Sequence, residues 1–278
     1  CEQVKGLLAS TGWEEVGLLS LATCDWNGLP EAMEKFAPML ADNQIKLSLP
    51  SLRVDAFSVN LAAGLESMRK GGLTFAPEAG TQRLRDVINK GVTDEAIEAA
   101  LDETFSHGWD RVKLYFMMGL PTETAEDLAG ILEICNRAVS IAKRHKRRGD
   151  VNASVAGFVP KAHTPFQWAA QLDKETVQRR QKMLKAEISK LKGVDFKYHE
   201  SDVSYIEAVF ARGDRRCAEV LARASELGCE FDGWTEFYDN DKWTQAFKDT
   251  GIDPNFYALR ARDIDEVLPW AHLDCGVS

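Results

Sequence analysis

Short apolar runs alternate with longer amphipathic segments along the first two thirds of the chain. The apolar runs have the length of buried strands, and the segments between them repeat apolar residues at helical spacing. Uninterrupted alternation of this kind predicts an α/β fold with a parallel sheet and right-handed crossovers. The predicted strands are Glu14–Ala22, Ile45–Leu49, Leu73–Ala76, Arg111–Met118 and Val151–Phe158.

Five strand–helix units are fewer than a closed eight-stranded barrel requires, so the pattern favours an incomplete barrel. Thr93 is a predicted N-cap, and Thr122 with Ala125 forms half of a capping box. Glu123, Glu126 and Asp127 suit the positive end of the helix that follows. The predicted helices are residues 1–10, a segment with Pro30 near its start, Leu61–Arg69, Thr81–Asn89, Thr93–His107, Thr122–Arg144 and Lys174–Lys192.

The pattern changes at about Gly193. One last extended segment, VDFKYHE, precedes two predicted helices that are separated at Gly213–Asp214. We therefore predict a barrel domain over residues 1–199 and a helical appendage over residues 200–278. An aromatic-rich segment follows the two helices, and its rings either form the core of the appendage or line a substrate entrance. The residues concerned are Trp234, Phe237 and Trp243.

Composition narrows the classes of protein only slightly. The formal net charge of -9 argues against a broad nucleic-acid-binding face, and no apolar run is long enough to span a membrane. The basic run Lys143–Arg148 is interpreted as a solvated helix end. The six cysteines are scattered without C-x-x-C spacing, which favours reduced thiols in a cytoplasmic protein.

The strand Arg111–Met118 has one apolar face and one mixed face. Lys113, Tyr115 and Met117 alternate with uniformly apolar residues, so they would point into the barrel. Polar groups in an enclosed space are costly unless they bond a ligand or each other. Lys113 and Tyr115 are therefore either ligand-binding residues or part of an internal pair, for which Glu78 is a candidate partner.

Two strand-to-helix turns carry further candidate residues. In GLPTET, Gly119 permits close backbone approach and Pro121 fixes the turn. Glu78, between Pro77 and Gly80, follows a strand. Its carboxylate would either accept hydrogen bonds from ribose hydroxyls or an amine, or cap the helix that begins near Thr81.

Taken together, these segments resemble the radical S-adenosylmethionine (radical SAM) superfamily over most of the chain. The third- to sixth-strand motifs of that family are matched in order and spacing by LSLPSLRVD (Leu47–Asp55), LTFAPEAGTQRLRDVINKGVT (Leu73–Thr93), GLPTET (Gly119–Thr124) and FVPKAHTPFQW (Phe158–Trp168). The resemblance implies a partial (β/α)6 TIM-like barrel, with strands two to six present, that holds S-adenosylmethionine (SAM) and a [4Fe–4S] cluster at its open end.

The resemblance also implies cofactor-binding roles for individual residues. Glu78 would meet the ribose or methionyl part of SAM, and Lys90 would meet the methionyl carboxylate. The backbone from Phe158 to Pro160 would lie against the adenine. The remaining candidates are Arg53 at the top of strand three, Ser20 and Thr23 near the methionyl amine, and Tyr115, with Lys113 on the same strand face.

One departure from the family is large. Its C-x-x-x-C-x-x-C motif binds three irons of the cluster, and no such spacing exists here. We expect that the first strand and its cluster loop precede Cys1, which would make the chain a fragment whose iron ligands lie outside it. The tail motifs ARGDRR, CEFDGW and EVLPWAHLDCGVS resemble a subgroup whose fuller members carry an upstream cobalamin-binding-type domain. This raises cobalamin as a cofactor of the full-length protein.

The leading functional hypothesis is the C-terminal part of a radical SAM enzyme. The complete enzyme would cleave SAM reductively to a 5′-deoxyadenosyl radical that acts on an unknown substrate, and this fragment alone would be inactive. Its implied partner is an electron donor such as flavodoxin or ferredoxin, with no membrane or nucleic acid indicated. The alternatives are a cluster-free barrel relative that acts as a binding or scaffold protein, and a phosphate-binding (β/α)8 enzyme, which would need further strands.

Overall fold

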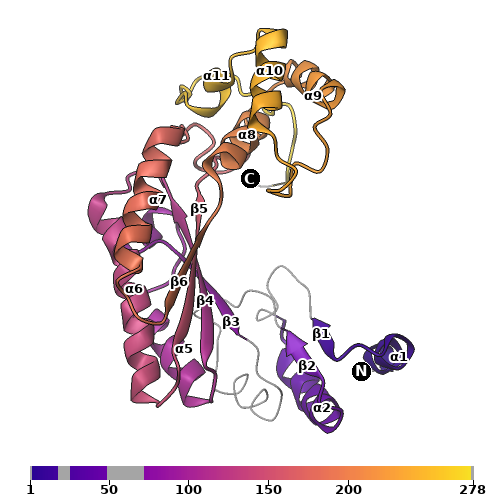
Figure 1. Cartoon of the computed structure of the whole chain (residues 1–278), viewed down its shortest axis with the longest axis vertical. Coiled ribbons are helices and arrows are strands. Elements are labelled where there is room, and N and C mark those ends of the chain that lie inside the picture. The colour runs from indigo at the N-terminus through magenta and orange to yellow at the C-terminus, as the bar shows by residue number, and fades with distance from the viewer. Residues whose placement is uncertain (1, 18–25, 49–71, 277–278) are drawn as a thin grey trace. The chain divides into compact units, whose positions relative to one another are not determined.

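The computed structural model describes residues 2–17, 26–48 and 72–276, shown in Figure 1. The chain divides into two compact units, and each is treated by itself. The first unit comprises Cys1–Phe116, Thr124–Val155 and Leu184–Lys197. The second unit comprises Met117–Glu123, Ala156–Met183 and Tyr198–Ser278.

The N-terminal part of the first unit contains two helices and two short strands. These are α1 (Glu2–Thr11), β1 (Glu15–Gly17), α2 (Leu29–Asp42) and β2 (Lys46–Ser48). Strand β1 pairs in parallel with β2, as predicted, with Val16 opposite Leu47. Burial is less than predicted in β1, because Glu15 and Gly17 are exposed. Residues 18–22 of the predicted strand and the predicted helix Leu61–Arg69 lie outside the described residues.

A four-stranded parallel sheet follows, with its strands in the order β3-β4-β5-β6. The strands are β3 (Leu73–Glu78), β4 (Arg111–Met118), β5 (Asp150–Gly157) and β6 (Val194–Tyr198). The connecting helices are α4 (Gln82–Val87), α5 (Asp94–Ser106), α6 (Ala125–Arg144) and α7 (Lys174–Ile188). Helices α5 and α6 lie on one side of the sheet (Figure 1). The predicted α/β class is confirmed, and the described strands form no closed barrel.

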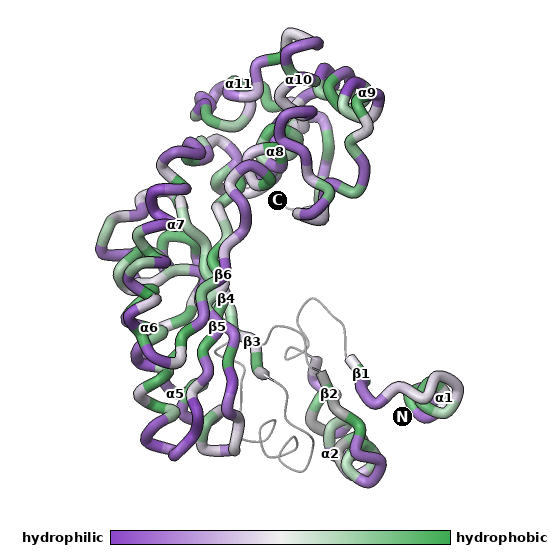
Figure 2. Tube along the Cα trace, viewed as in Figure 1, coloured by the Kyte–Doolittle hydropathy of each residue, from purple (hydrophilic) through white to green (hydrophobic). Residues whose placement is uncertain are grey.

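Strand β4 has the two faces that its sequence predicts. Val112, Leu114 and Phe116 are fully buried, whereas Lys113 and Tyr115 are partly exposed. Figure 2 shows apolar and polar residues alternating along α5 and α6. Burial of the apolar faces of strands and helices against each other is what stabilises this layer.

Helix α6 begins later than its sequence suggested. Thr124, not Thr122, is the N-cap, and the carboxylate of Asp127 accepts hydrogen bonds from the backbone nitrogen (2.7 Å) and hydroxyl (3.0 Å) of Thr124. Thr122 instead has a φ of 69°, which is incompatible with a right-handed α-helix. The prediction failed because the Gly119–Pro121 turn extends two residues further before the helix can start.

The C-terminal part of the second unit is helical. Its helices are α8 (Ser201–Ala211), α9 (Cys217–Glu226), α10 (Asn240–Thr250) and α11 (Pro254–Ala258), and the predicted interruption at Gly213–Asp214 is confirmed. Their shared core includes Tyr205, Val209, Val220, Trp243, Phe247 and Tyr257. Of the aromatic candidates, Trp243 belongs to this core, whereas Trp234 and Phe237 are 64% and 57% exposed.

Two chemical expectations are tested by the described part of the chain. Cys135 and Cys217 are buried and Cys229 is partly buried, and these thiols and that of Cys275 are free rather than disulfide-bonded. None of the described helices combines the length and apolarity that crossing a membrane would require.

Candidate functional site

Strand β3 ends in a bulge that changes the course of its backbone. Phe75 pairs with Leu114 and Glu78 pairs with Phe116, so β3 contains one more residue than β4 between these pairs. Pro77, which has no N–H to donate, lies in the bulge. Glu78 then has a φ of 70°, a conformation that is uncommon outside glycine. Bulges and strained residues of this kind concentrate at ligand-binding sites.

A fully buried arginine holds the segment that follows Glu78. The Nη1 of Arg85 donates to the carbonyl oxygen of Ala79 at 3.1 Å, and its Nε donates to that of Val92 at 2.7 Å. Its Nη2 lies 2.5 Å from the carboxylate of Asp94 in the first turn of α5. Arg85 therefore ties the residue after Glu78 to the start of the next helix, which stabilises the strained turn.

Two glycines let the same turn approach α6 closely. A Cβ atom on Gly80 would lie 2.2 Å from the carbonyl oxygen of Asp127 and 2.4 Å from the nitrogen of Ile131. A Cβ on Gly130 would lie 2.4 Å from the carbonyl oxygen of Gly80. Only glycine fits at these two positions, because both contacts are with backbone atoms that cannot move aside.

Asp127 joins the turn to the N-terminus of α6. Its buried carboxylate accepts hydrogen bonds from the hydroxyl of Thr81 and the guanidinium of Arg83, as well as from Thr124. Burial opposes ionisation, but these hydrogen bonds outweigh it and lower the pKa of Asp127 from 3.8 to about 2. The turn after Glu78 is thus fixed by Arg85, by the glycine contact and by an ionised aspartate.

An ion pair occupies the carboxyl end of β3. The ammonium Nζ of Lys90 lies 3.2 Å from Oε1 of Glu78, and the two side chains are 29% and 25% exposed. The backbone nitrogen of Lys90 donates to the carbonyl oxygen of Arg85 at 2.9 Å, which places Lys90 near the turn. The alternative role of Glu78 as a helix cap is not observed, because Thr81 caps α4 through Leu84.

The polar face of β4 contains a second pair. The Nζ of Lys113 lies 2.5 Å from the hydroxyl of Tyr115 and 4.4 Å from the centre of its ring. The two residues therefore contact each other, and Glu78 pairs with Lys90 rather than with Lys113. The structure thus brings four of the predicted residues together as two pairs within the first unit.

The turns that follow β4 and β5 belong to the second unit and have stabilising contacts of their own. Gly119 has a φ of 91°, and its nitrogen donates to the carboxylate of Glu123 at 2.9 Å. The side chain of Glu123 is only 2% exposed and also forms an ion pair with Arg180. The nitrogen of Phe158 donates to the carbonyl oxygen of Met118 at 2.8 Å, which joins the two turns.

The predicted adenine-binding segment packs within the second unit, with Phe158 partly exposed. The Phe158 ring meets that of Phe166 edge to face at 5.9 Å, and Pro160 is buried. Its backbone contact with adenine stays a prediction. Arg53, Ser20 and Thr23 lie outside the described residues.

Replacing Arg180 with glutamine should lower the free energy of unfolding by about 1.5 kcal/mol, because Glu123 would keep its buried charge but lose a charged hydrogen-bond donor. Urea denaturation followed by circular dichroism would measure this change. Arg179→Gln removes the same charge from an exposed neighbour and should change stability by less than about 0.5 kcal/mol. Equal effects of the two variants would contradict the role given to Arg180.

The described residues contain no arranged group of metal ligands. Across residues 2–17, 26–48 and 72–276, no group of three or more histidine, cysteine, aspartate or glutamate side chains is arranged to hold a metal ion. The residues that bind the turns most tightly, Arg85 and Asp127, were not predicted as site residues. The T-x-x-D spacing of Thr124 and Asp127 is the one sequence signal that could have indicated the second of them.

The arrangement of strands and helices resembles that of a solved protein structure. The fold is similar to that of SuiB from Streptococcus suis, with a TM-score of 0.50 and 13% sequence identity over 75% of this chain and 45% of that one. At this sequence identity the likeness concerns the fold alone.

A relative in sequence is an uncharacterized protein from Methanocaldococcus jannaschii. It is 30% identical over 219 residues, which make up 78% of this chain and 46% of the relative. No protein-family model matches the chain. The chain spans about half the length of both proteins that it resembles.

Proposed function

We propose that this chain is the C-terminal part of a radical SAM enzyme and that its strands contribute strands two to six of a partial (β/α)6 barrel. The observation that carries the proposal is the end of β3, where a bulge and a left-handed Glu78 present a carboxylate beside Lys90. Ligands of parallel α/β folds bind at the carboxyl ends of the strands. The order of the strand motifs and the similarity in fold to SuiB support the same conclusion.

The charges at this strand end fit the methionyl part of SAM. That group contains one carboxylate and one ammonium, and the site offers one lysine and one glutamate. Both side chains are partly exposed, so a ligand of this kind would replace the internal ion pair by two ion pairs of its own. In this proposal Lys90 binds the carboxylate, and Glu78 accepts hydrogen bonds from the amine or the ribose.

The described residues do not fit an iron–sulfur cluster. Such clusters are held by thiolates, whereas burial raises the pKa of the Cys135 thiol to about 12 and raises that of Cys217 as well. In the described part of the chain, no cysteine belongs to a group of three or more side chains that could hold a metal ion. The proposal therefore assigns the binding and orientation of SAM to this chain, and the iron ligands to residues outside it.

Lys90→Gln should weaken the binding of SAM by about tenfold, because a neutral amide replaces the ammonium that pairs with the methionyl carboxylate. Isothermal titration calorimetry of the chain with SAM would measure the loss. Binding of 5′-methylthioadenosine, which lacks both the carboxylate and the amine, should change little in the same variant. Glu95→Gln, an exposed change on α5, serves as the control for altered charge.

Two results would count against this assignment. Equal weakening of SAM and 5′-methylthioadenosine by Lys90→Gln would show that Lys90 acts on the fold rather than on the methionyl group. Failure of the unsubstituted chain to bind either ligand would remove SAM from the function. The cluster-free binding or scaffold protein would then be the better hypothesis.

A further inference from the structure

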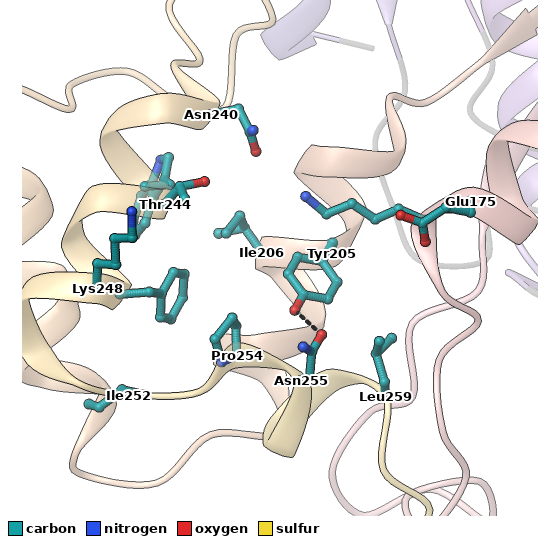
Figure 3. A pocket seen from close by; sticks show the side chains of 13 residues that line it. Glu175, Tyr205, Ile206, Asn240, Thr244, Lys248, Ile252, Pro254, Asn255 and Leu259 are labelled. Carbon is teal, nitrogen blue, oxygen red and sulfur yellow. Dashed lines mark hydrogen bonds between the residues drawn. The ribbon is translucent and has the colours of Figure 1, made fainter.

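The second unit contains a pocket of about 440 Å³ that the proposed SAM site does not use (Figure 3). Its walls come from the start of α7 and from α8, α10 and α11, and all its lining residues belong to the second unit. The aromatic residues Tyr205, Trp243 and Phe247 line it and are at most 7% exposed. A pocket of this size with aromatic walls has the dimensions of a small-molecule site.

One face of α10 presents polar groups to this pocket. Asn240, Thr244 and Lys248 are four residues apart, so they lie in one row along the helix. Figure 3 shows Asn240, Thr244 and Lys248 on the side of the pocket that α10 forms. The buried Trp243 and Phe247 each precede one member of this row. The helix thus offers a line of polar groups beside an apolar floor.

Several hydrogen-bond donors of the pocket have no acceptor within the described part of the chain. The indole Nε1 of Trp243 is buried and unpaired. No side-chain hydrogen bond or ion pair of Thr244 or Lys248 occurs within residues 2–17, 26–48 and 72–276. Buried donors are normally paired, so the indole of Trp243 lacks an acceptor that a ligand oxygen could supply. Thr244 and Lys248 are exposed, so they would exchange water for a ligand oxygen.

On the opposite wall of the pocket, the polar groups of Tyr205 and Lys174 already have partners. The hydroxyl of Tyr205 donates to Oδ1 of Asn255 at 2.7 Å. The ammonium of Lys174 lies 2.6 Å from Asp202 and 4.6 Å from the Tyr205 ring centre, so its charge is neutralised. Glu175 also lies on this side, across the pocket from Lys248 in Figure 3. The Lys248 end is therefore the positive end of the pocket.

We propose that this pocket binds a small carboxylic acid with a flat apolar body. The carboxylate would accept from Lys248 and Thr244, and the apolar body would pack against Trp243 and Phe247. Burial of an aromatic or aliphatic body against such rings supplies the hydrophobic part of the affinity. This inference is independent of the proposed SAM chemistry, because no residue of the pocket belongs to the β3 strand end.

The test uses 3-phenylpropionate as the probe and its neutral analogue 3-phenylpropionamide as the matched ligand. Titration calorimetry, or ligand-observed NMR for weak binding, should show the carboxylate binding the whole chain about tenfold more tightly than the amide. Lys248→Gln should remove most of this preference. Lys242→Gln removes the same charge from the same helix at a position outside the pocket and should keep it.

The outcomes separate the proposal from its rivals. Equal binding of carboxylate and amide by the unsubstituted chain, or no binding of either at millimolar concentration, would overturn it. Equal losses in Lys248→Gln and Lys242→Gln would also overturn it, because the effect would then reflect the net charge of the helix. Unchanged thermal melting of both variants would show that neither loss comes from unfolding.

Discussion

Gly80→Ala will lower the free energy of unfolding by about 3 kcal/mol, which is at the upper end of the range for overpacked sites. The added Cβ would lie 2.2 Å from the carbonyl oxygen of Asp127 and 2.4 Å from the nitrogen of Ile131. Neither atom belongs to a flexible side chain, so the turn and α6 must separate to accommodate the methyl group. Separation would also strain the hydrogen bonds that Thr81 and Arg83 donate to Asp127.

Urea denaturation monitored by circular dichroism would measure this loss, with Gly233→Ala as the matched control. Gly233 has no neighbouring atom within 4 Å of an added Cβ, and its φ is not in the left-handed region, so the control should change stability by less than about 0.5 kcal/mol. A Gly80→Ala protein as stable as the control would show that the turn is not packed as closely as described.

Asp127→Asn should cost about 2 kcal/mol at neutral pH, and this cost should disappear in acid. The folded pKa of Asp127 is about 2, below its ordinary value of 3.8, so ionisation favours the folded state. The resulting stability is fully present above pH 4 and is lost as the pH falls from about 4 to about 2. The asparagine variant does not ionise and therefore lacks this part of the pH dependence.

The measurement is the difference in free energy of unfolding between the unsubstituted chain and Asp127→Asn, taken by urea titration at several pH values from 7 to 2.5. Asp86→Asn, an exposed change on α4, provides the comparison and should show a small difference throughout. A difference for Asp127→Asn that stays constant with pH would mean that the carboxylate gains nothing from its hydrogen bonds when ionised.

Much of the fold was predictable because local patterns determine it. The alternation in Arg111–Met118 predicted both the bounds and the two faces of β4, since period-two patterns place side chains on opposite faces. Thr93 was predicted as an N-cap from its residue type and position alone, and it caps α5 through Ala96. Helix ends were less accurate, and α7 stops at Ile188 rather than Lys192.

The candidate site was only half predictable. Glu78 and Lys90 were each identified from the sequence, but their pairing required the turn between them to fold back. The bulge at Pro77 and the left-handed Glu78 lead into a turn that packs against α6, whose residues lie far along the chain. For Asp127 the sequence predicted only a favourable position at a helix terminus. Its hydrogen bond from Thr81 joins residues 46 positions apart, and no local pattern indicates such a contact.

The aromatic residues near the C-terminus show a different limit. Hydropathy alone does not distinguish a buried ring from an exposed one in an irregular segment, since no period defines a face. Trp243 lies within a helix and is buried, whereas Trp234 precedes it in an irregular segment and is 64% exposed. Predicting the burial of each ring would have required knowing whether its residue lies in a helix.

The strand order of the main sheet has a consequence for how the protein is made. Because β3, β4, β5 and β6 are neighbours in the same order as in the chain, each strand pairs with the one synthesised before it. A nascent chain can therefore extend the sheet one strand at a time, without waiting for a distant segment to leave the ribosome. Pairing between successive strands also keeps the loops that must close short, which favours rapid folding.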